Sequence, residues 1–113
     1  MPNVIEVGIA GVTFEGRQDV LRRMYQAQED GAALSGRLSR EPDNPYDPNA
    51  VRVYIGEMHV GYIPKALAAK LAARIDAGEA VTVARAHIIR GGDPDRITYG
   101  ARIHIEMPIK EAV

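Results

Sequence analysis

The segment from Arg40 to Ala50, Arg-Glu-Pro-Asp-Asn-Pro-Tyr-Asp-Pro-Asn-Ala, contains the side chains best suited to hold a ligand. A proline stands at every third position within it, which is the period of a polyproline II helix. Each proline fixes its own φ and moves the preceding residue out of the α region, so the segment is extended before any ligand binds. Tyr46 and Asp47 in its middle place an aromatic ring beside a carboxylate. We therefore predict a rigid loop that presents a ring and a hydrogen-bond acceptor.

The same composition also suits a loop that only connects two elements, because Asp, Asn and Pro are ordinary turn residues. A calcium loop is a further possibility, since four residues carry oxygen ligands: Asp43, Asn44, Asp47 and Asn49. However, an EF-hand needs ligands at alternate positions and a glycine in the middle. Pro45 occupies an alternate position and no glycine follows, which argues against calcium.

Motifs for catalysis or metal binding are weak elsewhere in the sequence. Gly56 and Gly61 are spaced like P-loop glycines, but Tyr62-Ile63 stands where Lys and Ser/Thr are required. Cysteine is absent, so a zinc site would need all three histidines, His59, His87 and His104. No serine lies in a nucleophile-elbow motif. We predict a protein that is not an enzyme and has neither metal nor cofactor.

Length and composition predict one domain, residues 1–113. Hydrophobic residues make up 46% and charged residues 26%, as in ordinary soluble proteins. No segment approaches the length of a membrane span and no signal peptide opens the sequence, so we expect a cytoplasmic protein with no membrane partner. The net charge of −1 argues against an extended electrostatic contact with duplex DNA, but allows a partner that offers few phosphates.

The spacing of apolar residues predicts six strands and two helices. The predicted strands are 4–14, 33–40, 50–54, 58–63, 80–90 and 97–107, with a long hairpin tip at 91–95. The predicted helices are 17–29 and a second one that opens at Pro64 and ends at Gly78. Short antiparallel strands with two short helices indicate an α+β fold, mainly β. We expect a six-stranded, OB-like (Greek-key) barrel.

Only six residues are aromatic, so their positions are informative. Four of them fall on predicted loops or strand ends that could converge at one mouth of the barrel: Phe14, Tyr46, Tyr62 and Tyr99. Stacking of a base on a ring contributes about 1–3 kcal/mol, so two rings could hold the end of a strand without a large basic surface. Phe14 and Tyr62 could instead belong to the core. Tyr46, flanked by prolines in a polar loop, is predicted to be exposed.

Four segments together resemble the HIRAN domain: residues 11–16, 40–50, 60–65 and 75–78. The resemblance spans roughly the whole chain, and the proline loop is its most specific part. HIRAN domains occur as N-terminal modules of fork-remodelling Swi/Snf-type translocases and as stand-alone bacterial or phage proteins. The resemblance implies an OB-like barrel that captures the 3′-hydroxyl end of single-stranded DNA, in a setting of DNA repair.

The resemblance also implies roles for individual residues. Tyr46 falls on the family's base-stacking tyrosine, and Asp47 falls on the aspartate that binds the 3′-hydroxyl. Asn44 matches the polar residue of the same loop. Phe14 matches a second stacking ring, and Lys65 matches a phosphate-contacting lysine.

Other positions match the family less closely. Tyr62 replaces a histidine next to the site, and Tyr99 falls roughly where another aromatic residue approaches the DNA. Thr13 stands where the eukaryotic remodeller has an arginine, and the helix of residues 17–29 is an insertion relative to that protein. Both departures bear on affinity more than on the location of the site.

The sequence thus predicts a non-enzymatic module that binds the 3′ end of single-stranded DNA, with a separate helicase or nuclease as a partner. Lys65 is the main expected cation, joined by Arg17 or Arg102. The alternative is a small protein-interaction barrel whose proline loop docks another protein. Hydrolase activity or zinc binding would belong to the larger proteins that carry this domain and not to the domain itself.

Overall fold

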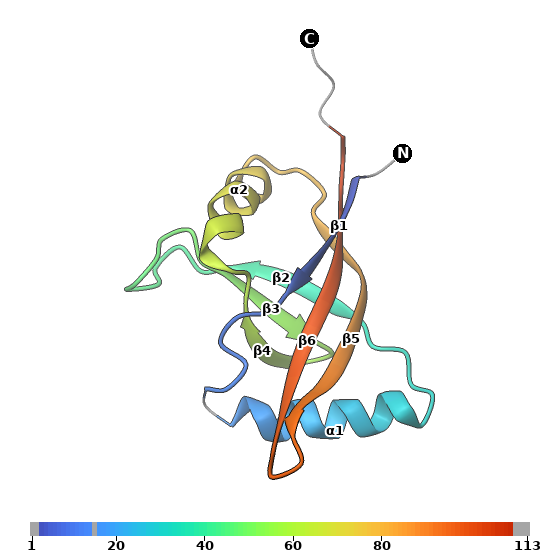
Figure 1. Ribbon diagram of the computed structural model, residues 1–113. Coiled ribbons are helices and arrows are strands. Elements are labelled where there is room, and N and C mark those ends of the chain that lie inside the picture. Colours follow the sequence, from blue (N-terminus) through green and yellow to red (C-terminus); the bar gives the residue numbers. More distant parts are fainter. Residues whose placement is uncertain (1–2, 15, 110–113) are drawn as a thin grey trace.

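Strands dominate the computed structural model, which describes residues 3–14 and 16–109 (Figure 1). Residues 1–2, 15 and 110–113 of the predicted domain lie outside the described part. The strands are β1 (Asn3–Gly8), β2 (Gly36–Arg40), β3 (Val51–Ile55), β4 (Met58–Tyr62), β5 (Thr82–Asp93) and β6 (Arg96–Met107). The helices are α1 (Arg17–Glu29) and α2 (Lys65–Asp76). No helix in the described ranges is long and apolar enough to cross a membrane.

The strands pair into two antiparallel sheets of three strands each, with the orders β1–β6–β5 and β2–β3–β4. The predicted α+β class, with six strands and two helices, is confirmed, but a closed barrel is not seen. Single bridges link the sheets at two points, Ala10 to Tyr62 and Leu34 to Ala86. Pairing stops at the first point because Gly11 has a φ of 74°, which turns the chain away from the sheet.

The core lies on the inner faces of the two sheets. Along β3, buried and half-buried residues alternate, as expected for a strand with one face inward. Ile103 and Ile105 of β6 are fully buried, and Arg102 and His104 between them are not, which confirms the predicted alternation. The helices add further buried side chains: Leu21, Ala68, Leu71 and Ala72.

Helix α1 has the predicted bounds, and it lies across the long β5–β6 hairpin (Figure 1). Two of its glutamines bind open strand edges. Gln18 donates to the Tyr99 carbonyl of β6 at 2.7 Å and accepts from the Tyr99 N–H at 2.8 Å. Gln28 makes the same pair of bonds with Ile88 of β5, at 3.0 and 2.7 Å. Each carboxamide takes the place of a neighbouring strand. The backbone N–H and C=O groups of Tyr99 and Ile88, at the open edges of the hairpin, are thereby hydrogen-bonded.

Several predicted boundaries are wrong, including the starts of the second and fifth strands, which lie at Gly36 and Thr82. The first strand ends at Gly8 rather than at residue 14, because the chain turns at Gly11. The predicted tip at 91–95 shortens to two residues, since the ladder continues to Asp93 opposite Arg96. The second helix begins at Lys65, because Pro64 has an extended ψ of 141° and forms the N-cap.

Gly61 should be essential to the contact between the sheets, because a Cβ there would lie 2.3 Å from the Ala10 carbonyl oxygen. We expect Gly61→Ala to lower the free energy of unfolding by about 1–3 kcal/mol, as overpacking does. Chemical denaturation measures this change. Gly100→Ala in β6 is the matched control, since a Cβ there meets nothing within 4 Å. Equal stability of the two variants would contradict the role given to Gly61.

Candidate nucleic-acid interface

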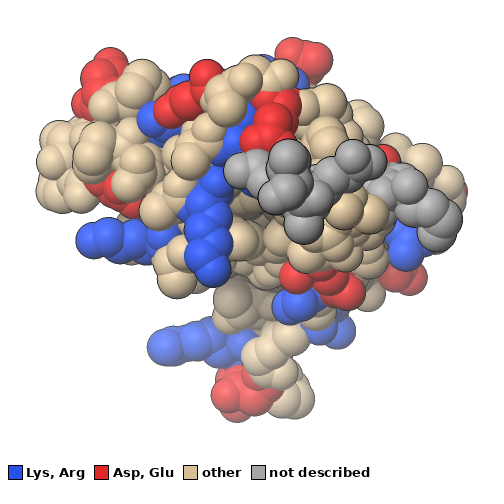
Figure 2. Space-filling view, turned by 90° about the horizontal axis from the view of Figure 1, so that it is seen from above, with Lys and Arg blue, Asp and Glu red and all other residues tan. Residues whose placement is uncertain are grey.

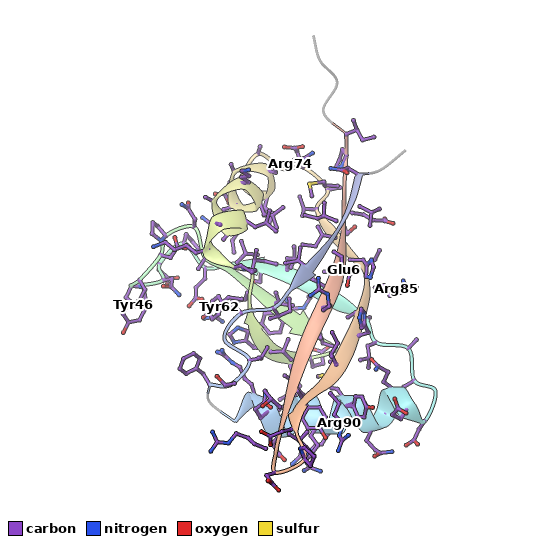
Figure 3. The ribbon with its side chains drawn as sticks, in the orientation of Figure 1. Glu6, Tyr46, Tyr62, Arg74, Arg85 and Arg90 are labelled. Atoms are coloured by element: carbon purple, nitrogen blue, oxygen red, sulfur yellow. The ribbon has the colours of Figure 1, made fainter. Side chains whose placement is uncertain are left out.

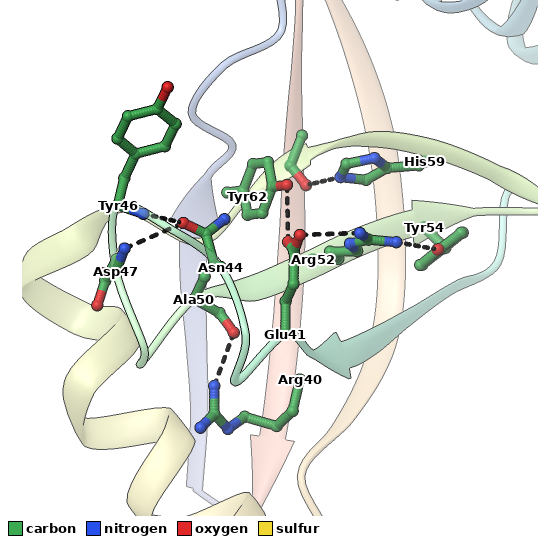
Figure 4. Close-up of polar contacts among 11 residues, drawn as sticks. Arg40, Glu41, Asn44, Tyr46, Asp47, Ala50, Arg52, Tyr54, His59 and Tyr62 are labelled. Atoms are coloured by element: carbon green, nitrogen blue, oxygen red, sulfur yellow. Dashed lines mark hydrogen bonds and ion pairs between the residues drawn. The ribbon is translucent and has the colours of Figure 1, made fainter.

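The loop of residues 41–50 joins β2 to β3, and Arg40 fixes its ends. The Arg40 guanidinium donates to the carbonyl of Ala50 at 2.8 Å (Figure 4). The same group donates to the carbonyl of Pro48 at 3.0 Å. It also forms an ion pair with Asp76 of α2 at 3.0 Å. The backbone adds a bond from the Glu41 N–H to the Ala50 carbonyl at 3.0 Å. The base of the loop is therefore tied to itself and to α2.

Inside the loop, two predicted site residues bind the backbone. Asn44 Oδ1 accepts from the N–H groups of Tyr46 and Asp47 at 2.8 and 3.0 Å, and Asp47 Oδ1 accepts from the Asn49 N–H at 2.8 Å (Figure 4). These bonds are typical of Asx turns. Together with the backbone bonds from the Asn44 N–H to the Glu41 carbonyl and from the Ala50 N–H to the Asp47 carbonyl, they fold the loop into turns, so the predicted extended segment is wrong. Asn44 and Asp47 thus shape the loop, and a carboxylate with two oxygens retains capacity to accept further bonds.

Two aromatic rings are exposed, and both lie beside this loop. All six aromatic residues are described, and only Tyr46 (91% exposed) and Phe14 (65%) are classed as exposed. Tyr46 is exposed as predicted and projects from the tip of the loop (Figure 3). The exposure of Phe14 excludes it from the core, whereas Tyr62 is half-buried.

Two adjoining hollows, together called the groove here, bring most of the predicted site together. The larger, of about 540 Å³, is lined by Phe14, Arg17, Glu41 and Pro45. The smaller, of about 310 Å³, is lined by Asp47, Ala50, Ile63 and Lys65. Both share four lining residues: Ala10, Asn44, Tyr46 and Tyr62. Six of the seven predicted residues therefore line one groove.

Tyr99 does not line the groove. Its ring packs 5.5 Å from that of Tyr25 in α1, and its backbone binds Gln18. The β5–β6 hairpin carries Tyr99 against helix α1, and the sequence did not reveal this contact. Arg102, considered as a second cation, is paired instead with Glu6 at 2.6 Å on the sheet of β1.

Arg17 and Glu41 also line the groove. From the sequence, Arg17 is expected only as an additional cation, and Glu41 has no expected role. Arg17 is only 7% exposed; its Nη1 donates to the Gly11 carbonyl at 2.6 Å, and its guanidinium lies 5.6 Å from the Tyr62 ring centre. Glu41 accepts from the Tyr62 hydroxyl and from Arg52, each at 2.8 Å (Figure 4). Glu41 could be noticed in the sequence only as a residue before proline, because its partners depend on strand register.

These contacts fix the charges of the groove floor. The hydrogen bond from Arg52, with help from Tyr62 and Asn44, lowers the pKa of Glu41 to about 2, although burial opposes this. Burial and the bond to Glu41 raise the pKa of Tyr62. At neutral pH the carboxylate is therefore ionised and the phenol keeps its proton.

The surface has no single electrostatic character. Seen from above, acidic and basic side chains alternate over the molecule, and no broad basic field appears on this face (Figure 2). Within the described ranges, no group of three His, Asp or Glu side chains is arranged to hold a metal ion. The groove itself combines exposed aromatic rings, hydrogen-bonding groups and the two cations Arg17 and Lys65.

The sequence profile of the HIRAN domain family matches residues 3–108. The chain belongs to the HIRAN domain family. The fold of this HIRAN domain is similar to the crystal structure of the HIRAN domain of human HLTF, with a TM-score of 0.60 and 18% identity. That match covers 93% of this chain and 74% of the HLTF chain. No curated protein sequence matches the chain.

Replacing Glu41 tests the groove floor. We expect Glu41→Gln to lower the free energy of unfolding by about 1–3 kcal/mol at neutral pH, because bonds to a charged acceptor are lost. Since the carboxyl pKa falls on folding, from 4.5 to about 2, this stabilisation is complete above pH about 4.5 and disappears as the pH approaches 2.

Denaturation of wild type and Glu41→Gln across this pH range measures the effect. The difference between the two should shrink as the pH falls. Asp43→Asn, an exposed change in the same loop, is the matched control and should show no such trend. A difference that stays constant from pH 7 to pH 2 would refute the role of the Glu41 charge.

Proposed function

We propose that this HIRAN domain binds the 3′-hydroxyl end of single-stranded DNA in the groove and performs no chemistry on it. The observation that carries the proposal is the joint exposure of Phe14 and Tyr46 in a groove that Asp47 also lines. HIRAN domains are DNA-binding modules, and family membership supports DNA as the ligand. The protein would present the captured end to a separate helicase or nuclease, as DNA repair requires.

The rings supply most of the affinity. Each stacked base contributes about 1–3 kcal/mol, whatever its identity. The loop that carries Tyr46 is held by Arg40, by its own Asx turns and by three prolines. Little further ordering is needed on binding, so less of the stacking energy is lost to entropy.

Asp47 supplies selectivity. An ionised carboxylate only accepts hydrogen bonds, so it can receive one from a free 3′-hydroxyl. A 3′-phosphate brings about −1.5 to −2 charges near pH 7 and is repelled. An internal phosphodiester is repelled too, and its chain would have to continue through the rigid loop. Asp47 therefore rejects other ligands more than it strengthens the right one.

Two cations balance the phosphates near the end. Lys65 is exposed in the first turn of α2 and lines the same hollow as Asp47, where the positive end of the helix dipole adds to its charge. Arg17 lines the other hollow. It comes from the inserted helix α1, so it provides a guanidinium at the groove although Thr13 replaces the family's arginine.

The exposed ring of Tyr46 gives the first test. We expect Tyr46→Ala to weaken binding of a 3′-hydroxyl oligonucleotide by about 1–3 kcal/mol, as loss of one stacked base does. The melting temperature should stay near that of wild type, because the ring is 91% exposed. Fluorescence anisotropy measures the binding, and Tyr46→Phe, which keeps the ring, is the control. A strong fall in melting temperature with intact binding would make Tyr46 a structural residue.

The chemistry of the end gives the second test. Matched oligonucleotides carry a 3′-hydroxyl, a 3′-phosphate, or no end at all in a closed circle. We expect wild type to bind only the first well, because only that ligand donates to Asp47 and avoids its charge. Asp47→Ala should narrow the gap, mainly by raising the affinity for the 3′-phosphate and the circle, which no longer meet the negative charge.

The outcomes separate the candidate functions. Equal binding of the circle and the hydroxyl end by wild type would refute end capture. Absence of binding to every oligonucleotide at low salt, where phosphate contacts are strongest, would refute DNA binding. The exposed Tyr46 would then favour the alternative, in which the proline loop docks a partner protein.

A further inference from the structure

A row of aromatic rings and guanidinium groups leaves the groove along the outer face of the β2–β3–β4 sheet. It begins at Tyr62, whose ring centre lies 5.0 Å from that of His59. The His59 ring lies 5.5 Å from Tyr54, and the Arg37 guanidinium lies over Tyr54 at 3.9 Å. In Figure 4, Arg52, His59 and Tyr54 lie on the side of Tyr62 that faces away from Tyr46 and Asp47.

Strand register produces this row. Arg52 stands opposite Tyr62, and Tyr54 stands opposite both His59 and Arg37. A shift in pairing between Val53 and Tyr54 brings Tyr54 and His59 into line. Alternate residues of β3 point inward, so the members of the row share the outer face. Three neighbouring strands therefore contribute to one continuous surface.

The row carries net positive charge. Arg52 is paired with Glu41, whereas Arg37 is exposed and contacts Tyr54. A guanidinium held over a ring has its second face available, and bases stack on such planes. Rings and guanidiniums together stack bases and neutralise phosphates, which is the combination that single-stranded nucleic acids need.

The groove sets the direction in which a bound strand must run. Asp47 lines the smaller hollow, and Arg17 and Glu41 line only the larger one. A strand whose 3′ end lies at Asp47 and whose next base stacks on Phe14 would run through the larger hollow, which Phe14 and Glu41 line. Glu41 and Tyr62 stand there at the beginning of the row.

We propose that the row formed by Tyr62, His59, Tyr54 and Arg37 is a second subsite, which binds the nucleotides on the 5′ side of the captured end. This inference rests on the proposed function, because the captured end fixes where the strand enters the row. Arg37 forms its far end. The subsite makes affinity depend on strand length as well as on the chemistry of the end.

The test compares a dinucleotide with a hexanucleotide, both with a free 3′-hydroxyl, by competition against a labelled oligonucleotide. We expect the dinucleotide to end before Arg37 and the hexanucleotide to reach it. We expect wild type to bind the hexanucleotide about 10-fold or more tightly, the equivalent of about one stacked base. Arg37→Ala should remove most of this gain and leave the dinucleotide affinity unchanged.

Two variants separate stacking from charge and from nonspecific effects. Arg37→Lys keeps the positive charge but loses the planar guanidinium. It should therefore retain only part of the preference for the hexanucleotide over the dinucleotide. Arg23→Ala removes an exposed arginine of α1 that pairs with Asp19, and it should change neither affinity. Melting temperatures of all variants confirm that they are folded.

Failure of this inference and failure of the proposed function give different results. If wild type binds both lengths equally, or if Arg37→Ala binds the hexanucleotide as wild type does, the second subsite is refuted and end capture stands. If neither oligonucleotide binds wild type, both are refuted. A loss in Arg37→Lys as large as that in Arg37→Ala supports stacking of a base on the guanidinium.

Discussion

The carboxylate of Glu41 is the point at which the proline loop, β3 and β4 are joined. It begins the loop and binds Tyr62 of β4 and Arg52 of β3. A carboxylate that is only 15% exposed must keep its charged partner, because an unpaired charge in such a place is strongly destabilising. The orientation of Tyr62, and with it the boundary between the groove and the row on the β2–β3–β4 sheet, follows from this one acceptor.

Rigidity in the loop comes from the same residues that make it suitable for binding. Asn44 and Asp47 bind the loop backbone and also line the groove. Arg40 holds the base of the loop against α2. The exposed ring of Tyr46 therefore stands on a support that does not need to order when a ligand arrives, which favours affinity from a small number of contacts.

Helix α1 is an integral part of the architecture. Gln18 and Gln28 bind the open edges of the β5–β6 hairpin, and Leu21 is fully buried. The same helix begins with Arg17 at the groove. Helix α1 therefore both completes the sheet edges and brings a guanidinium to the candidate site.

The sequence by itself determined the features that depend on nearby residues. The period of two in β3 and β6, the helix of residues 17–29, and the exposure of Tyr46 in the proline loop follow from local sterics and patterning. The HIRAN family was also recognisable, because the proline loop is a contiguous motif. These features need no information about distant parts of the chain.

Only the tertiary structure decided which side chains meet in the groove. Strand register and helix packing decide that Glu41 contacts Tyr62 and Arg52. They also decide that Arg17 lies at the groove and that Tyr99 packs against α1 instead. The two separate sheets in place of a closed barrel have a similar origin, since the turn at Gly11 limits pairing to one bridge. Such contacts join residues far apart in the chain, and local propensity carries no information about them.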